Sequence, residues 1–154
     1  MTLTLAIPGL AEFRLEHLLL DVNGTVANRG KLLPGVESRI KALDEALSVH
    51  LVSADTFGTL ASIAELLGVT AVTAASGDDK LTHLNTLGRA HCAVIGNGAN
   101  DVQVLVACAI GFAVIGPEGA NSAALGAADV VCGSVLDALD LLLDARALAA
   151  TLRP

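Results

Sequence analysis

Aromatic residues are almost absent from this sequence, which contains three Phe and neither Trp nor Tyr among its 154 residues. Hydrophobic residues nevertheless make up 53% of the chain, so its core must consist mainly of Ala, Val, Leu and Ile. The length is typical of one domain and is sufficient to bury a full core without disulfides or structural metals. We therefore predict a single domain that comprises residues 1–154.

The sequence also lacks a hydrophobic run long enough to span a membrane. Its most apolar stretch, residues 102–115, has 14 residues and contains Gly111. A membrane-spanning helix requires about 20 apolar residues. The N-terminus has neither the basic region nor the long apolar segment of a signal peptide. We expect a soluble, cytoplasmic protein with no membrane partner.

Positive charge and cysteine are scarce as well. Nine Lys and Arg residues oppose 16 Asp and Glu residues, which gives a net charge of −7. The chain has neither a basic stripe nor aromatic side chains for base stacking, which disfavours nucleic acid as the main partner. The three cysteines form no CxxC pair. Their spacing disfavours a disulfide framework and a structural zinc site, and it is consistent with reduced thiols.

Short apolar runs alternate with segments of helical periodicity along most of the chain. We predict strands at residues 17–22, 49–54, 69–74, 92–95, 110–115 and 129–132. We predict helices at residues 34–47, 56–67, 78–87, 101–108, 120–125 and 136–143. This alternation is typical of an α/β fold, a three-layer Rossmann-like domain with a mainly parallel sheet. The N-terminal segments 2–7 and 11–15 are predicted to form a hairpin at the edge of that sheet.

Polar residues follow the predicted strands where their carboxyl ends lie. Asp21 and Ser53 end the first two strands, and Lys80 begins the helix after the third. Asn97 and Asp101 follow the fourth strand. Because ligands bind at the carboxyl ends of such sheets, we expect these side chains to meet in one crevice. Carboxylate and amide oxygens beside a lysine suit a Mg²⁺ ion and a phosphate group.

These residues resemble the four sequence motifs of the haloacid dehalogenase (HAD) superfamily. The first motif is Asp-Val-Asn-Gly-Thr at residues 21–25, and the second and third are Ser53 and Lys80. The fourth is Gly-Asn-Gly-Ala-Asn-Asp at residues 96–101. The first and fourth motifs are most similar to those of P-type ATPases and of the soluble P-type ATPase-like proteins. The resemblance runs from residue 17 to the C-terminus, and it implies a HAD core that acts as a Mg²⁺-dependent phosphatase.

The resemblance implies a role for each of these residues. Asp21 is the nucleophile that forms an aspartyl phosphate, and Lys80 neutralises charge on Asp21 and on the phosphate. Asn23 occupies the catalytic position two residues after the nucleophile. Four residues are implied as substrate contacts: Ser53, Gly24, Thr25 and Asn100. Four residues are implied as Mg²⁺ ligands: Asp21, Asn23 through its backbone carbonyl, Asn97 and Asp101.

Two positions depart from the pattern of HAD phosphatases. Asn23 stands where those enzymes have an Asp that protonates the leaving group and later activates water. An amide cannot titrate, and general acid–base help is worth about 10²- to 10⁴-fold in rate, so we expect slow hydrolysis. Asn97 replaces another acid of the usual fourth motif. We therefore expect weaker Mg²⁺ binding, with Asn97 as a ligand through its amide oxygen.

The spacing of the motifs leaves no room for an inserted domain. Only 31 residues separate Asp21 from Ser53, and only 26 separate Ser53 from Lys80. Neither the cap domains of HAD enzymes nor the nucleotide-binding insertion of a P-type pump fits there, so we predict a capless core. Such an open site needs another chain or a large substrate to shield it. We therefore expect a homo-oligomer that acts on a small phosphorylated metabolite or a phosphorylated macromolecule.

A second function class stays open, because Asn23 and Asn97 weaken the catalytic interpretation. It is a HAD-fold protein with little or no activity that binds phosphate or metal in a regulatory or interaction role. Other polar residues have structural interpretations. We expect Asp55 and Thr56 to cap the helix at 56–67, and we expect a turn at 116–119 to line the mouth of the site without a catalytic role for Glu118. Histidine and cysteine are interpreted as structural, at His17, His50, His83, His91, Cys92, Cys108 and Cys132.

Overall fold

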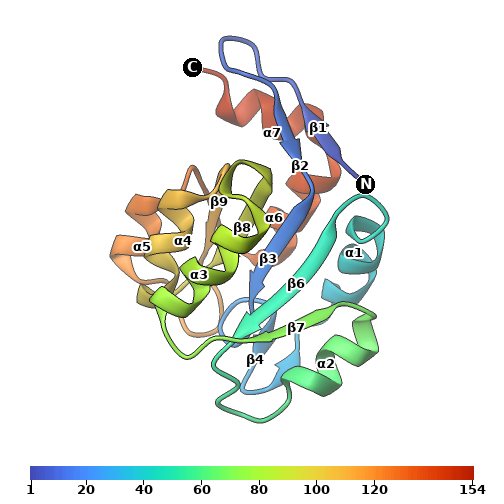
Figure 1. Cartoon of the computed structure of the whole chain (residues 1–154), viewed down its shortest axis with the longest axis vertical. Coiled ribbons are helices and arrows are strands. Elements are labelled where there is room, and N and C mark those ends of the chain that lie inside the picture. The colour runs from blue at the N-terminus through green and yellow to red at the C-terminus, as the bar shows by residue number, and fades with distance from the viewer.

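The computed structural model describes every residue from Met1 to Pro154 and is built around one six-stranded sheet (Figure 1). The strands lie in the order β10-β9-β8-β3-β6-β7, and every neighbouring pair is parallel. Their bounds are β3 His17–Asp21, β6 Ser48–Ser53, β7 Thr70–Thr73, β8 Cys92–Gly96, β9 Ile110–Val114 and β10 Val130–Cys132. This arrangement confirms the predicted α/β fold with a parallel sheet.

Helices cover both faces of the sheet, which gives three layers. One face carries α1 Val36–Leu43, α2 Leu60–Leu67 and α6 Val135–Leu143. The other carries α3 Gly77–Leu87, α4 Val102–Ala107 and α5 Ser122–Ala127. Phe112 is the one phenylalanine among the buried hydrophobic side chains, which are otherwise Ala, Val, Leu, Ile and Cys, so the core is poor in aromatic residues as expected. No helix combines the length and the apolar character needed to cross a bilayer.

The N-terminal hairpin forms, but it is not part of the main sheet as predicted. Strands β1 Leu3–Leu5 and β2 Phe13–Leu15 pair antiparallel in a sheet of their own. Figure 1 shows this hairpin beside α7 Ala145–Leu152. The sequence pattern does not predict this C-terminal helix. Leu5, Leu15 and Leu148 are almost fully buried in the same cluster. The hairpin therefore lies beside the C-terminal helix and forms no backbone hydrogen-bond ladder with an edge of the main sheet.

The order of the strands creates a crevice at the carboxyl end of β3. From this central strand the chain builds β6 and β7 on one side and then β8, β9 and β10 on the other. Loops that leave β3 and β8 therefore diverge, which is where open parallel sheets bind ligands. A small hairpin, β4 Ala27–Asn28 and β5 Lys31–Leu32, follows β3 at this end. A short 3₁₀ helix, η2 Ala99–Asp101, follows β8, and another, η1 Arg89–His91, precedes it.

The helix predicted from residue 56 begins later, at Leu60. Asp55 and Gly58 have φ angles of +60° and +69°, which keep residues 55–58 out of the helical conformation. Asp55 still serves this helix, because its Oδ1 accepts a hydrogen bond from Leu60 N at 3.0 Å. The delayed start leaves an exposed turn at the end of β6, and this turn borders the site.

Candidate active site

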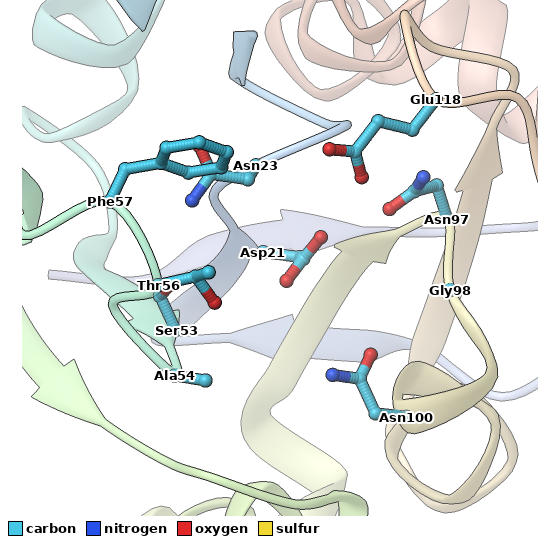
Figure 2. Close-up of a pocket in the computed structure, with 10 residues that line it drawn as sticks. All are labelled: Asp21, Asn23, Ser53, Ala54, Thr56, Phe57, Asn97, Gly98, Asn100 and Glu118. Carbon is cyan, nitrogen blue, oxygen red and sulfur yellow. The ribbon is translucent and has the colours of Figure 1, made fainter. Parts of the chain in front are cut away.

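The predicted site residues surround one polar pocket at the carboxyl ends of β3, β6 and β8. Its volume is about 360 Å³, and Figure 2 shows the side chains that face it. Ten residues line it: Asp21, Asn23, Ser53, Ala54, Thr56, Phe57, Asn97, Gly98, Asn100 and Glu118. The structure thus brings together residues of the first, second and fourth motifs, while the third motif reaches Asp21 from beneath the pocket.

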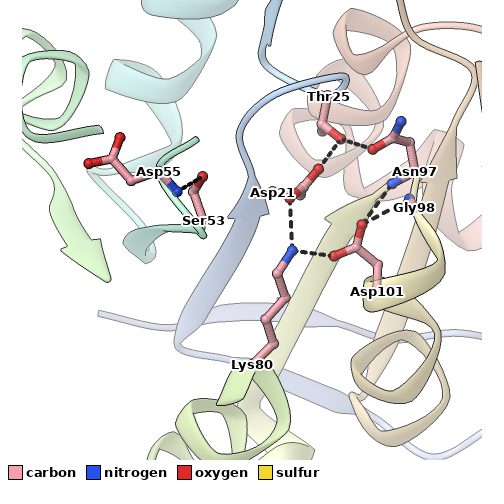
Figure 3. Close-up of polar contacts among 8 residues, drawn as sticks. All are labelled: Asp21, Thr25, Ser53, Asp55, Lys80, Asn97, Gly98 and Asp101. Atoms are coloured by element: carbon pink, nitrogen blue, oxygen red, sulfur yellow. Dashed lines mark hydrogen bonds and ion pairs between the residues drawn. The ribbon is translucent and has the colours of Figure 1, made fainter. Parts of the chain in front are cut away.

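Lys80 lies between two carboxylates at the floor of the site. Its Nζ is 2.8 Å from Asp21 Oδ1 and 2.7 Å from Asp101 Oδ1 (Figure 3). Lys80 enters from the first turn of α3, and this helix approaches η2 closely because residue 77 is a glycine. A Cβ there would lie 3.1 Å from the Asn100 carbonyl oxygen. The two acids and one lysine carry one net negative charge, which favours a bound cation.

The electrostatics of this floor follow from its burial. Burial and the neighbouring Asp101 carboxylate raise the pKa of Asp21 to about 6, although Lys80 and the Thr25 hydroxyl act in the opposite direction. For Lys80, burial acts to lower the pKa, but the two carboxylates outweigh it and raise the pKa above its ordinary value. Lys80 is therefore positively charged at neutral pH. A cation in the pocket would favour the ionised form of Asp21.

Asp101 holds the loop that follows β8. Its Oδ2 accepts hydrogen bonds from the backbone N–H groups of Asn97 and Gly98 at 3.1 and 3.0 Å. Its Oδ1 is bound to Lys80, and the side chain is 2% exposed. Both oxygens thus have protein partners, and Asp101 does not line the pocket. Its contacts favour a positioning role, beneath the residues that face a ligand.

Thr25 is fully buried and links the first and fourth motifs. Its hydroxyl lies 3.1 Å from Asp21 Oδ2 and 3.1 Å from Asn97 Oδ1, so it can donate to either oxygen. Gly24 has a φ of +84°, and a Cβ there would lie 2.6 Å from Glu118 Oε2. Neither residue lines the pocket. Although they were predicted as substrate contacts, their positions favour shaping the site around Asp21.

Asn23 uses its side chain to hold the small hairpin. Its Oδ1 accepts a hydrogen bond from the N–H of Gly30 at 2.9 Å, and Gly30 has a φ of +81° in the turn between β4 and β5. Asn23 and Phe57 both line the pocket (Figure 2). The amide is therefore a structural tether as well as a group that cannot exchange protons.

Ser53 lines the pocket at the end of β6. Its Oγ accepts a hydrogen bond from the backbone N–H of Asp55 at 2.9 Å, which leaves the hydroxyl hydrogen free to donate toward the pocket. Asn100 is exposed and lines the opposite rim. These two polar groups flank Asp21 in Figure 2. The arrangement suits an anion held above the Asp21 carboxylate.

Two further residues, Phe57 and Glu118, line the rim of the pocket. Phe57 is 47% exposed and belongs to the turn after β6. Glu118 belongs to the turn after β9, and its carboxylate faces the pocket (Figure 2). The same rule that selected Asp21 and Ser53, polar residues after strand ends, also applies to Glu118. The turn lies at the mouth of the site, as predicted, and Glu118, for which no catalytic role is predicted, lines the pocket.

The chain resembles two archaeal proteins in sequence, and no protein-family model matches it. Uncharacterized protein MJ0073 of Methanocaldococcus jannaschii is 48% identical over 59 residues, which are 38% of this chain and 63% of that relative. The chain thus spans less than two thirds of its length. Uncharacterized protein MJ0072 of the same organism is 46% identical over 39 residues, 25% of this chain and 89% of that relative. The chain belongs to the same family as MJ0072.

Solved structures identify the fold. A 3-deoxy-D-manno-octulosonate 8-phosphate phosphatase from Moraxella catarrhalis, in complex with magnesium, phosphate and KDO, has a TM-score of 0.72 and 20% identity over 90% of this chain and 94% of its own. A candidate HAD superfamily (subfamily III A) hydrolase from Legionella pneumophila has a TM-score of 0.66 and 20% identity, over 90% of this chain and 87% of its own. The chain has the HAD-superfamily fold. This confirms the resemblance seen in its motifs.

A P-type ATPase shares the same core. A zinc-transporting PIB-type ATPase in its E2·Pi state has a TM-score of 0.66 and 27% identity. The match covers 78% of this chain but only 20% of the ATPase. The fold of this chain therefore corresponds to a small part of that pump.

Proposed function

We propose that this protein is a HAD-type phosphatase that transfers a phosphoryl group to Asp21 and then to water. The observation that carries the proposal is the placement of Asp21 on the floor of a polar pocket. One of its oxygens is bound by Lys80 and the other by Thr25, while Ser53 and Asn100 flank it. This is an oriented carboxylate nucleophile beside groups that bind an anion.

The donors around this pocket fit a hard divalent cation such as Mg²⁺. Oxygen ligands are those that Mg²⁺ prefers, usually one or two carboxylates together with the phosphate of a substrate. Asp21 and the amide oxygen of Asn97 face the same cavity in Figure 2, and the backbone carbonyl of Asn23 is the third group proposed. A bound Mg²⁺ would supply positive charge to the substrate phosphate and to Asp21. The M. catarrhalis phosphatase structure contains magnesium and phosphate, which supports this assignment.

The proposed reaction proceeds in two displacements. An oxygen of Asp21 attacks the phosphorus atom, and the bond from phosphorus to the leaving oxygen breaks as the aspartyl phosphate forms. Lys80 and the Ser53 hydroxyl stabilise the charge on the phosphoryl oxygens. A water molecule then attacks the same phosphorus atom, which releases inorganic phosphate and restores the Asp21 carboxylate. Because Asn23 cannot give or take a proton in either step, the enzyme should favour substrates with good leaving groups.

The pocket favours a small phosphorylated metabolite as substrate. A volume of about 360 Å³ accommodates a phosphate and a compact polar group, and eight of the ten lining residues are not hydrophobic. The structurally similar 3-deoxy-D-manno-octulosonate 8-phosphate phosphatase of M. catarrhalis is a precedent for such substrates on this fold. We propose the soluble capless core as the active unit, and a homo-oligomer as the arrangement that shields its open mouth.

A phosphatase assay tests the proposed function directly. The protein is incubated with Mg²⁺ and acetyl phosphate or p-nitrophenyl phosphate, and phosphate release and trapped acyl phosphate are measured. Both signals should vanish in Asp21→Asn. Asp137→Asn, the same change at an exposed position on α6, should leave them intact. Absence of both signals in the wild-type protein would overturn the proposal.

The same assay separates the second function class. A HAD-fold protein that only senses its ligand would bind Mg²⁺ and inorganic phosphate without releasing product from either substrate. Asn23 favours this alternative, because its amide can neither give nor take a proton during turnover. Binding of Mg²⁺ and phosphate without turnover would therefore contradict the proposed phosphatase activity and support a phosphate- or metal-binding regulatory protein.

A further inference from the structure

Among the acids of the four sequence motifs, only Asp21 lines the pocket of the proposed cation site, and Asp21 already forms an ion pair with Lys80. Lys80 lies 2.8 Å from Asp21, and Asp101 is beneath the pocket with both oxygens bound. Of the ten residues that line the pocket, only Asp21 and Glu118 are acids. Glu118 forms no ion pair or side-chain hydrogen bond with the protein. Glu118 is exposed and is the one acid lining the pocket that has no charged partner in the protein.

The turn that carries Glu118 is seated directly on the first motif. Gly116 and Gly119 close the turn through a hydrogen bond from Gly119 N to Gly116 O at 2.9 Å. The turn approaches so closely that a Cβ on Gly116 would overlap the carbonyl oxygen of Gly24. In the other direction, a Cβ on Gly24 would lie 2.6 Å from Glu118 Oε2. Two glycines thus allow the Glu118 carboxylate to lie over the loop that follows Asp21.

Asn97 holds this turn from the other side. Its Nδ2 donates a hydrogen bond to the carbonyl of Gly119 at 3.2 Å, and its backbone carbonyl accepts one from Asn121 N at 2.8 Å. An Asp at position 97 could not donate the first of these bonds. The same Nδ2 lies 2.7 Å from the Cβ position of Gly24, close to the point that Glu118 Oε2 approaches. Replacement of the acid at position 97 therefore provides the donor that fixes the turn bearing Glu118.

We propose that Glu118 is a ligand of the divalent cation and supplies the negative charge that Asn97 lacks. Figure 2 shows the side chains of Asp21, Asn97 and Glu118 directed into the same cavity. In this arrangement Glu118 supplies the carboxylate that the usual fourth motif has at the position of Asn97. The inference rests on the proposed function, because it assigns a further ligand to the cation of that site.

Metal binding in the absence of any substrate tests this assignment. Mn²⁺ serves as the probe, and the electron paramagnetic resonance signal of the free ion reports the bound fraction. Glu118→Gln should weaken Mn²⁺ binding by about tenfold or more, because one of two carboxylates in the pocket becomes neutral. Glu65→Gln, the same change at an exposed position on α2, should bind as the wild type does. Equal affinities of the Glu118→Gln and Glu65→Gln proteins would overturn the inference.

A relocated acid provides a second test. In the double variant Asn97→Asp/Glu118→Gln, the carboxylate returns to the fourth motif while the net charge equals that of the wild type. Recovery of most of the lost Mn²⁺ affinity would support the inference, because a carboxylate at residue 97 would then substitute for the one at residue 118. A double variant that stays as weak as Glu118→Gln, with an unchanged circular dichroism spectrum, would contradict it.

These outcomes are independent of the phosphatase assay. Turnover by the wild-type protein together with Mn²⁺ affinity that does not depend on Glu118 would overturn the ligand assignment alone. Mn²⁺ binding that depends on Glu118, without any turnover, would overturn the proposed phosphatase activity and support Glu118 as a cation ligand. The two proposals can therefore fail separately.

Discussion

The Nζ atom of Lys80 lies 2.8 Å from Oδ1 of Asp21, although 59 positions separate the two residues in the sequence. The contact exists because β3 ends beneath the first turn of α3, and because Lys80 is buried there beside Asp101. One ammonium group therefore compensates two carboxylates whose side chains are only 12% and 2% exposed, at Asp21 and Asp101. This relationship makes Lys80 important for folding as well as for the proposed chemistry.

We expect Lys80→Met to destabilise the protein by about 3–5 kcal/mol at neutral pH, because the change leaves two buried carboxylates without a cation. The loss should become smaller as the pH falls through the pKa of Asp21, about 6, because the protonated Asp21 no longer needs a cation. Urea denaturation followed by circular dichroism at several pH values measures both effects. Lys41→Met is the matched control, since its exposed pair with Glu37 should contribute only about 0.3–0.5 kcal/mol.

Replacement of Asn23 by Asp should accelerate release of phosphate from the aspartyl phosphate. An Asp can accept the hydrogen bond from Gly30 N as Asn23 Oδ1 does, so the hairpin should keep its place. It would add a group that can activate water, and general base catalysis is worth about 10²- to 10⁴-fold. Decay of the trapped phosphoenzyme measures this step. Asn28→Asp, at the exposed residue of β4, should leave the decay rate unchanged, and equal rates in all three proteins would contradict the prediction.

Thr25→Val should lower stability by about 1–3 kcal/mol, because Asp21 Oδ2 and Asn97 Oδ1 lose a buried donor. The two side chains are nearly the same size, so packing should change little. Thermal unfolding measures the loss. Thr82→Val, on the exposed face of α3, removes a hydroxyl that bonds only to a backbone carbonyl of its own helix and should cost much less.

The sequence predicts most of the site because its residues follow one local rule. Asp21, Ser53 and Asn97 each lie at or just after the end of an apolar run, and a parallel sheet places such ends together. The roles of Thr25 and Asp101 are less accessible to this reasoning. Both lie within motifs, but only the packed structure shows that Thr25 bridges Asp21 and Asn97 and that Asp101 has no free oxygen.

Features that depend on contacts between distant elements could not be predicted. The N-terminal hairpin lies beside α7 and outside the main sheet: its two strands pair with each other, and Leu5 and Leu15 belong to the hydrophobic cluster that also contains Leu148 (Figure 1). The turn at Asp55 delays α2, because a positive φ at a non-glycine residue has no clear signature in the sequence. Three histidines interpreted as isolated structural residues also meet in space, and their spacing gives no sign of it.

These histidines form a chain at the side of the sheet away from the pocket residues. His17 Nδ1 lies 3.2 Å from His50 Nε2, and His50 Nδ1 lies 3.4 Å from His83 Nε2. The residues come from β3, β6 and α3. Three neutral rings satisfy both contacts with one hydrogen each, whereas a protonated His50 must donate from both nitrogens. Burial, and then the positive charge of neighbouring rings, lowers the pKa of His50 to about 4.

Stability should therefore fall in acid because of His50. Its pKa in the folded protein is about 4, below the ordinary value of 6.5. Between these pH values the unfolded chain binds more protons, so folding stability rises with pH and is lost as the pH falls from 6.5 toward 4. We expect a contribution on the order of 2 kcal/mol across this interval. Denaturation at pH 7, 5.5 and 4.5 should show a flatter dependence in His50→Gln than in the wild type. His91→Gln, at an exposed position, should keep the wild-type slope, and parallel profiles for all three proteins would show that His50 does not titrate in this way.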